Sequence, residues 1–385
     1  MLLGAVMLTA DICIVGGGLL GTATAFYAAK AGLKVALVEE RELASGTSGV
    51  AFGGVSLAIY SYASARVPKS YVELSKASLS LYQRAQQEIG PPLDLDAPGS
   101  IDPFYNEEDS ARGLERCRGL QACGVPCEFI DYKQIKQIEP AVAPIAIHAI
   151  YCPVDAHVTP MGVVWAFAKA ARQMGAEILT NTRAISLISR GQRVVGVATS
   201  AGEIFASDVV CASGSGVPSL AAGVGIQVPL DLARGQMFVT ERIPPLLRTY
   251  VHNIKQTPAG AIVFGTTREP GVKDTTVTSV EGTHKMLKWA SELVPALANV
   301  KLLRSWAGLR LLPPDGYPII GRPEGVEGLL LAVMHRGVTL APAVGSILTD
   351  LITDGKTALD ISPYRLERFA SSAAGAEAQE TFYGT

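Results

Sequence analysis

The sequence predicts an α/β fold in which a Rossmann-like domain, assembled from separate segments, carries an inserted antiparallel-sheet domain. Three observations support this prediction. A strand, a glycine-rich turn, a helix and a second strand follow one another within residues 11–38, which is a βαβ unit. Strand patterns without intervening helices occupy 176–211 and 226–265. The chain then forms an apolar strand at 328–333 and a helix over 338–354.

The individual elements follow from local patterns. DICIV at 11–15 and KVALV at 34–38 are short buried strands, and the alanine-rich segment 19–31 is a helix that ends at Gly32. Four more helices are predicted at 69–89 (stopped by Gly90-Pro91-Pro92), near 107–123, at 160–174 and at 283–298. The later strands are predicted at 176–188, 193–200, 203–211 and within 226–265, which contains a turn at 256–260.

We expect two domains from this order of elements. The nucleotide-binding domain is expected to comprise 8–90, 145–220 and 300–385, because these ranges hold the alternating strands and helices. The inserted domain is expected to comprise 91–144 and 221–299, where strand patterns dominate. The inserted domain would supply the wall of a substrate site.

Composition describes a globular chain without a nucleic-acid or membrane signature. The 385 residues are 48% apolar and 18% charged, which allows a substantial core. The net charge of −2 provides no basic excess for nucleic acid. No run of about 20 apolar residues predicts a transmembrane segment, and no basic residues precede the apolar start as in a secretory signal. We therefore expect a cytoplasmic protein. The six cysteines lack CxxC or zinc-like spacing, so we expect no metal site.

A glycine motif predicts a dinucleotide site. Gly16, Gly18 and Gly21 form GxGxxG between a predicted strand and a predicted helix. The first glycine permits a tight turn, the second lets a pyrophosphate approach the backbone, and the third lets the helix pack on the strand. The helix N-terminus adds N–H donors for phosphates. Glu39, 21 residues after Gly18, ends the second strand, where an acid accepts hydrogen bonds from ribose hydroxyls.

Two small-residue segments favour FAD over NAD. Ser45-Gly46-Thr47-Ser48 and Gly53-Gly54 allow a loop to pass tightly over a large planar ligand; the alternative is a flexible surface loop. The stretch 203–216 places a strand before small residues, as where backbone packs near a pyrophosphate or adenosine.

With these motifs the chain resembles the family of FAD-dependent amine and D-amino-acid oxidoreductases, which includes glycine oxidase, sarcosine oxidase and D-amino-acid oxidase. The matching motifs occur in the family's order over nearly the whole chain: GGGLLG (16–21), VEE (38–40), SGTSGVAFGGV (45–55), DVVCASG (208–214), WAGLRLLPPDGYPIIG (306–321) and HRGVTLAPAVG (335–345). Together they are specific to the family, although not to one substrate.

The resemblance implies a set of residues that bind FAD. They are Gly16, Gly18, Leu19, Leu20, Gly21, Glu39, Glu40, Thr47, Ser48, Gly53, Gly54, Ala184, Gly214, Gly308, Arg310, Gly337, Val338, Thr339 and Leu340. Some relatives attach FAD through a cysteine in the segment that matches 309–321. Because this chain has no cysteine there, we expect FAD to be held non-covalently.

The resemblance also implies the chemistry. Arg310 matches the arginine that binds the substrate carboxylate, and a guanidinium suits this role because it binds a carboxylate through two parallel hydrogen bonds. The family's reaction is hydride transfer from the substrate Cα to flavin N5, followed by hydrolysis of the imine. The electron acceptor is O₂ in an oxidase and a quinone or protein partner in a dehydrogenase. The sequence does not separate the two, and we favour an oxidase.

Departures from the family pattern suggest the substrate. His335 and Arg336 stand in a shortened MHRG segment, and Arg268 replaces a neutral residue. If both arginines point inward, we expect a secondary amine with two carboxylates, such as iminodiacetate or an opine. The alternative is that Arg268 or Arg336 faces solvent or pairs with Glu269. Further candidates for substrate contact lie on the strand that aligns with the pocket wall of relatives: Tyr250, His252 and Asn253.

Other functional interpretations remain open at this point. One is a glycine or D-amino-acid dehydrogenase. Another is a flavin-binding subunit of a larger amine dehydrogenase, so that both a homo-oligomer and a hetero-oligomer fit the sequence. An NAD-linked hydroxy-acid dehydrogenase is disfavoured by the 45–55 loop and the turn after the last strand.

Overall fold

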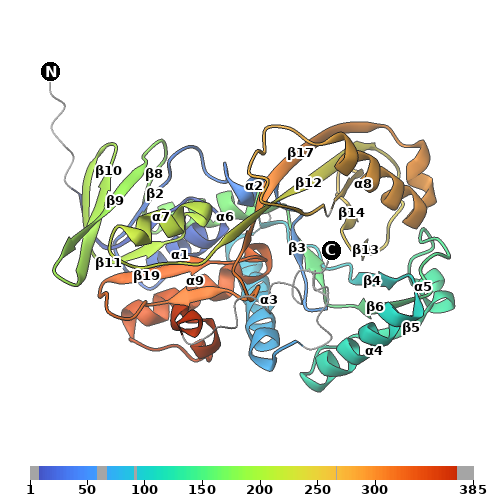
Figure 1. Ribbon diagram of the computed structural model, residues 1–385, viewed down its shortest axis with the longest axis horizontal. Helices are drawn as coiled ribbons and strands as arrows, with labels where there is room; N and C mark the ends of the chain where they lie inside the picture. Colours follow the sequence, from blue (N-terminus) through green and yellow to red (C-terminus); the bar gives the residue numbers. More distant parts are fainter. Residues whose placement is uncertain (1–7, 59–66, 91–92, 266, 371–385) are drawn as a thin grey trace.

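Two large β-sheets organise the computed structural model (Figure 1). The structure describes four stretches of the chain: 8–58, 67–90, 93–265 and 267–370. The expected domain ranges extend into segments that lie outside the described residues: 59–66, 91–92, 266 and 371–385. Within the described part, no helix combines the length and the hydropathy needed to cross a bilayer.

The first sheet is the predicted nucleotide-binding sheet. Its strands are β1 (Leu8–Val15), β2 (Val35–Val38), β8 (Glu177–Leu179), β9 (Ala184–Arg190), β10 (Arg193–Thr199), β11 (Gly202–Cys211), β18 (Ile319–Gly321) and β19 (Leu329–Val333). The strands β19, β11, β1, β2 and β8 lie side by side in this order and run parallel. β18 pairs antiparallel with β19, and the β9–β10 hairpin pairs with β11. This arrangement confirms the predicted α/β class.

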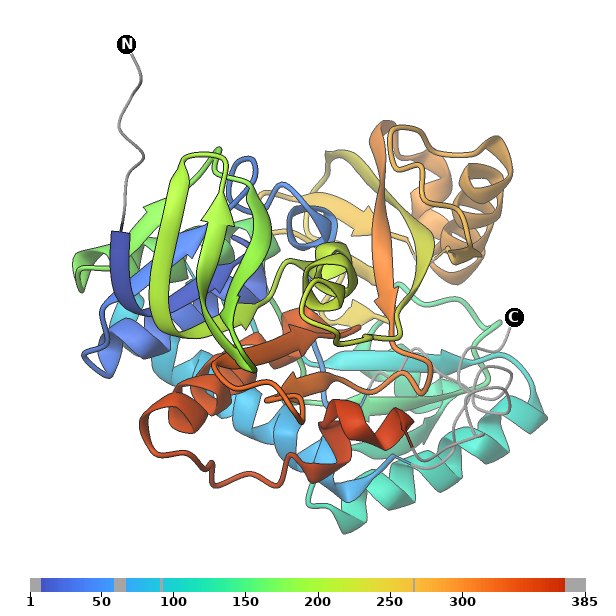
Figure 2. The ribbon, with the colours of Figure 1, turned by 60° about the vertical axis from the view of Figure 1, so that its left-hand side comes forward.

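Side chains of this sheet alternate between two cores, as period-2 strands require. Ile12 and Ile14 of β1 face a core with four helices, whereas Cys13 and Val15 face a core under the β9–β10 hairpin. Figure 2 shows this hairpin in front of the parallel strands. The helices of the first core are α1 (Leu19–Lys30), α3 (Lys69–Ile89), α6 (Pro160–Gln173) and α9 (Gly337–Thr353). The short helix α7 (Val217–Ala222) packs in the second core. Both faces of the parallel sheet are therefore buried, which explains its nearly continuous apolar strands.

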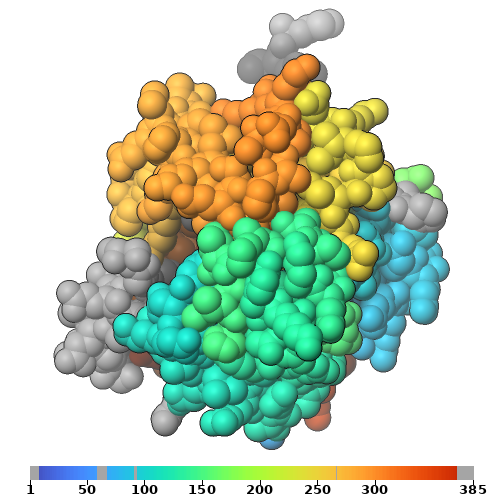
Figure 3. Space-filling model, turned by 90° about the vertical axis from the view of Figure 1, so that its right-hand side faces the viewer, coloured from blue at the N-terminus to red at the C-terminus, as the bar shows by residue number. Residues whose placement is uncertain are grey.

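The second sheet is mainly antiparallel and forms the inserted domain. Its strands are β4 (Ser100–Phe104), β5 (Glu128–Asp131), β6 (His148–Cys152), β12 (Asp231–Arg242), β13 (Tyr250–Val251), β14 (Ile254–Gln256), β15 (Ala261–Phe264), β16 (Glu269–Pro270) and β17 (Leu302–Leu312). The helices of this domain are α4 (Glu107–Ala122), α5 (Tyr132–Ile138) and α8 (Val280–Leu293). On its outer face, Figure 3 shows segments from the first and the last third of the chain side by side.

Three elements differ from the expectations. The single strand expected at 176–188 is two strands, β8 and β9, because the chain turns between them with Asn181 in the left-handed region (φ 54°). The helix expected at 283–298 is α8, which begins after Ser279 because that side chain accepts a hydrogen bond from Gly282 N and caps the helix. Helix α5 was not anticipated, although Asp131 and Gln134 form a capping box at its start.

Two strands also lie across the expected domain boundaries. β6 and β17 belong to ranges expected in the nucleotide-binding domain, yet both pair within the second sheet. β17 lies antiparallel to β12 along almost its whole length, with Gly308 opposite Gly235. This long ribbon carries residues from the second sheet to the edge of the first (Figure 1).

Candidate active site

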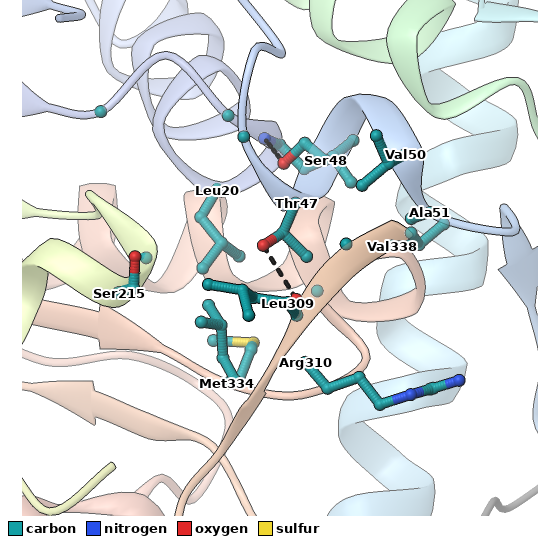
Figure 4. A pocket seen from close by; sticks show the side chains of 18 of the residues that line it. Leu20, Thr47, Ser48, Val50, Ala51, Ser215, Leu309, Arg310, Met334 and Val338 are labelled. Atoms are coloured by element: carbon teal, nitrogen blue, oxygen red, sulfur yellow. Dashed lines mark hydrogen bonds between the residues drawn. The ribbon is translucent and has the colours of Figure 1, made fainter. Parts of the chain in front are cut away.

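A cavity of about 730 Å³ begins at the carboxyl ends of the parallel strands. Its lining includes the residues that follow β1, β2, β11 and β19, and these ends of an open α/β sheet are where ligands bind. The cavity continues to the β12–β17 ribbon and the β13–β14 turn of the second sheet. Figure 4 shows Leu20, Ser215 and Met334, which follow β1, β11 and β19, around the same space as Leu309 of β17.

The glycine turn after β1 has no room for side chains. Gly16 has φ +114°, and a Cβ there would lie 2.6 Å from the Ala212 carbonyl oxygen. A Cβ on Gly18 would lie 2.8 Å from Ser48 Oγ, and a Cβ on Gly21 would lie 1.9 Å from the Gly16 carbonyl oxygen. Gly16 and Gly18 line the cavity, whereas Gly21 lets α1 pack on β1. This bare backbone at a helix N-terminus fits the pyrophosphate of a dinucleotide.

Glu39 is fixed at the end of β2. Its carboxylate accepts hydrogen bonds from Gly17 N (2.7 Å), Arg41 N (3.0 Å) and Ser45 Oγ (3.3 Å). Both Glu39 and Glu40 line the cavity. The carboxylate is therefore held beside the glycine turn, at the position where an acid meets a ribose.

The small-residue loop closes over the middle of the cavity and includes the short helix α2 (Thr47–Val50). Thr47 Oγ1 donates to the Leu309 carbonyl of β17 (2.9 Å), and Ser48 Oγ accepts from Leu19 N (3.0 Å), as Figure 4 shows. Gly53, with φ +95°, is packed so closely that a Cβ would lie 2.2 Å from the Val158 carbonyl oxygen. The loop thus joins the glycine turn to the second sheet.

The turn from β19 into α9 lies at the other side of this loop. Gly337, Val338 and Thr339 line the cavity, and the N-cap residue Arg336 forms no side-chain capping hydrogen bond. The first N–H groups of a helix have no intrahelical acceptors and carry a partial positive charge. This turn can therefore stabilise negative charge on a ligand. Leu340 is buried beneath the turn and does not line the cavity.

Arg310 extends from β17 into the part of the cavity that faces the second sheet (Figure 4). Its Nε donates to the Thr267 carbonyl (3.1 Å), and its Nη1 lies 3.4 Å from His335 Nε2. The guanidinium crosses Gly235 of β12, where a Cβ would lie 2.8 Å from Nε. A side chain at position 235 would therefore displace the guanidinium.

His335 lies among three arginines. Burial and the positive charges of Arg310, Arg336 and Arg268 hold the pKa of His335 well below its usual value. The ring is therefore neutral at neutral pH, and Nε2 can accept a hydrogen bond from Arg310. Arg268 does not line the cavity, although its charge reaches His335.

Arg336 fixes the turn on which it stands. The residue has a left-handed backbone (φ 57°) directly before α9. Its Nη2 donates to the Ser56 carbonyl (2.8 Å), and its guanidinium lies 5.9 Å from the centre of the Tyr71 ring. Both contacts hold the loop and α3 against the turn. Arg336 thus lines the cavity while its guanidinium contacts protein groups.

The structure places most of the predicted residues in one cavity. All the residues expected to contact FAD or substrate line it except Gly21, Arg268 and Leu340. Tyr250, His252 and Asn253 come from the β13–β14 turn, and the Tyr250 hydroxyl lies 3.4 Å from the buried Asp155 carboxylate. Several lining residues were not anticipated: Phe52, Ser56, Arg183, Gly235, Met237, Gly265 and Met334. Phe52 lies within the loop motif 45–55, but no local pattern indicated the others.

Comparison with known proteins agrees with this geometry. Residues 11–351 match the family model described as "FAD dependent oxidoreductase". The chain is 28% identical to hydrogen cyanide synthase subunit HcnC of Pseudomonas protegens, covering 94% of this chain and 97% of that protein. It is 29% identical to glycine oxidase of Geobacillus kaustophilus, covering 93% and 97%.

The fold comparison gives the same result. The crystal structure of that glycine oxidase matches with a TM-score of 0.86, covering 94% of this chain and 99% of the other. The structure of L-proline dehydrogenase from P. horikoshii matches with a TM-score of 0.88 at 28% identity, covering 95% and 99%. The family match spans the glycine turn, the loop, β17 and the start of α9. The chain therefore belongs to the family of FAD-dependent oxidoreductases, and its cofactor is FAD.

Proposed function

We propose that this protein oxidises the C–N bond of a small amino acid, with N-substituted glycines as the preferred class. The observation that carries the proposal is the position of Arg310. It is a cation on a rigid strand, partly buried and in contact with a neutral imidazole, in the part of the cavity beyond the small-residue loop. A guanidinium in such a place binds a carboxylate and fixes the adjoining α-carbon.

The proposed roles of the remaining residues follow from their positions. FAD, when bound, supplies the two-electron acceptor for the substrate. The glycine turn and Glu39 would hold its pyrophosphate and ribose, and the 45–54 loop would cover it. Val338 and Thr339, at the positive end of α9, would stabilise negative charge that develops on the ring. Arg310 would orient the substrate, while apolar side chains such as Phe52 and Met237 exclude water.

Replacement of Arg310 tests the substrate role directly. Arg310→Lys keeps a positive charge but loses the planar pair of donors, so we expect kcat/KM to fall about 10- to 100-fold, mainly through KM. Arg304→Lys is the matched control, because Arg304 is exposed on the same strand β17. An unchanged KM in Arg310→Lys would contradict the role of Arg310.

The number of carboxylates is a separate question. Because Arg336 holds the Ser56 carbonyl and Tyr71, we propose a monocarboxylate such as sarcosine ahead of iminodiacetate. A dicarboxylate is the second candidate, since the charge of Arg268 reaches His335 and places another cation near Arg310. Comparison of kcat/KM for glycine, sarcosine and iminodiacetate decides between them. A preference of about tenfold or more for iminodiacetate that is lost in Arg268→Ala would support the dicarboxylate.

For the electron acceptor we propose O₂, in keeping with the glycine oxidases among the relatives. The alternative is a flavoprotein subunit that passes electrons to a partner, and it is supported by the similarity to HcnC, which is a subunit of hydrogen cyanide synthase. One hydrogen peroxide formed per substrate oxidised in air supports the oxidase. Turnover that needs an artificial acceptor, without peroxide, supports the subunit.

A further inference from the structure

His252 is held by a buried carboxylate at the substrate end of the cavity. The residue occupies the turn between β13 and β14 with a left-handed backbone (φ 51°). Its Nδ1 lies 2.7 Å from Asp102 Oδ1, and the imidazole lines the cavity with 26% of its side chain exposed. Asp102 comes from β4, about 150 residues earlier, and its second oxygen is paired with Arg116 of α4.

Whether Asp102 is ionised determines which ring nitrogen of His252 carries the proton. Burial opposes ionisation of Asp102, but Arg116 and the hydrogen bond from His252 outweigh it and lower the pKa of this carboxyl below its usual value. An ionised carboxylate only accepts hydrogen bonds. Nδ1 of His252 is therefore the donor, and in the neutral ring Nε2 carries the lone pair.

The surroundings of the imidazole leave Nε2 available. Its ring packs edge-on to Trp289 of α8, with 6.0 Å between the centroids, and Trp289 Nε1 donates to the Tyr105 hydroxyl (3.3 Å). Among the described residues, none forms a hydrogen bond with His252 Nε2. The charged and titratable groups linked to the ring are Asp102, Arg116 and Tyr105, on the side of β4 and α4. Arg310, His335 and Arg336 line the same cavity.

We propose that His252 is the general base that takes the proton from the ammonium group of the substrate. An amino acid in water carries a protonated amine, and its α-carbon becomes a hydride donor only when the nitrogen lone pair is free. In the proposed step the N–H bond of the ammonium breaks, its proton moves to His252 Nε2, and the electron pair remains on the amine nitrogen. The imidazolium is stabilised by Asp102 and returns the proton to water after the product leaves. This inference rests on the proposed function.

The test compares His252→Asn with a matched control. Asparagine cannot act as a base at neutral pH, and it tolerates the left-handed backbone that position 252 requires. The control is His148→Asn, because His148 is also half-buried and bonded through Nδ1, to Ser110 Oγ at 3.1 Å, but does not line the cavity. Asp102→Asn tests the positioning role of the carboxylate, and FAD content verifies that each variant folds.

Anaerobic flavin reduction by sarcosine is measured from about pH 6 to about pH 10. We expect His252→Asn to reduce at least about tenfold more slowly than wild type at neutral pH and to recover as the pH approaches about 10, where the amine loses its proton unaided. Asp102→Asn should shift the profile in the same direction by a smaller factor. His148→Asn should follow wild type. A His252→Asn profile that coincides with wild type would overturn the inference.

A binding measurement gives a readout without turnover. 2-Methylalanine (α-aminoisobutyrate) has no hydrogen on its α-carbon, so it binds without being oxidised, and its Kd can be followed by the flavin spectrum. In wild type the ligand can pass its ammonium proton to His252 on binding, whereas in His252→Asn it cannot, so we expect a weaker Kd in His252→Asn at neutral pH that approaches the wild-type Kd as the pH rises to about 10. Equal Kd values in the two proteins at neutral pH would count against the inference. If no amine reduces the wild-type flavin, the proposed function itself fails, which is a different result from equal profiles.

Discussion

The position of the Arg310 guanidinium depends on a missing side chain on the neighbouring strand. Gly235 of β12 lies under it, and a Cβ there would approach Nε to 2.8 Å. Strand pairing places Gly308 opposite Gly235, so neither strand carries a side chain at this pair of positions beside Arg310. The Arg310 guanidinium is therefore positioned by the glycine backbone as well as by its contacts with the Thr267 carbonyl and His335.

Gly235→Ala should weaken substrate binding with little loss of stability. The added methyl group pushes the guanidinium aside, so we expect KM to rise about tenfold or more while FAD content is retained. The control is Gly119→Ala on α4, where a Cβ meets nothing within 4 Å. Steady-state kinetics of both variants provide the measurement, and an unchanged KM in Gly235→Ala would show that Arg310 does not hold the substrate.

A single buried histidine, His157, makes the folding stability of the protein depend on pH. Burial, with Lys255 nearby, lowers the pKa of His157 from 6.5 to about 3. The unfolded chain therefore binds a proton between these values that the folded chain does not, so folding stability falls as the pH drops below about 6.5. Between pH 7 and pH 5 we expect this residue to lower the free energy of unfolding by about 1–2 kcal/mol. Urea unfolding of His157→Asn should show a smaller loss than wild type over this range; an equal loss would contradict the assignment.

At the scale of elements, the first turn of α9 lacks one helical hydrogen bond, and a side chain of α3 supplies a replacement. Pro342 lies inside α9 and has no N–H to donate to the Val338 carbonyl, four residues earlier. The Tyr82 hydroxyl of α3 donates to that carbonyl instead (2.6 Å), and Ser78 Oγ accepts from Ala343 N (3.3 Å). The turn that lines the cavity is therefore held by a neighbouring helix.

Tyr82→Phe removes the hydrogen bond from the Tyr82 hydroxyl to the Val338 carbonyl and should destabilise the protein. The Val338 carbonyl is half-buried, so the loss of this hydrogen bond costs about 0.5–1.5 kcal/mol. We expect a lower melting temperature and weaker retention of FAD, because Val338 lines the cavity. Tyr27→Phe on α1 is the control, since no hydrogen bond of the Tyr27 hydroxyl occurs among the described residues. Equal melting temperatures in Tyr82→Phe and wild type would refute the role of this hydroxyl.

At the scale of the whole molecule, local sequence patterns predict the arrangement of the first sheet. They do not predict which strands pair in the second sheet, because those strands are far apart in the sequence. The glycine turn, Glu39 and helix α1 lie within one short βαβ unit, so spacing alone predicts their arrangement. β17 pairs with β12, which lies about 70 residues earlier in the chain. Gly308 also interrupts the alternation of apolar and polar residues along β17, which would otherwise indicate a strand. The Asp102–His252 contact joins residues about 150 positions apart, and no local pattern predicts it.

The central claim is that this flavoprotein oxidises a small amino acid held by Arg310. The most direct test is an anaerobic titration of the FAD-loaded protein with glycine, sarcosine, iminodiacetate and the carboxylate-free amine dimethylamine. We expect the visible flavin absorption to be bleached by at least one amine that bears a carboxylate and not by dimethylamine, and we expect Arg310→Lys to require more substrate for the same bleaching. A flavin that stays oxidised with all of these amines would contradict this claim.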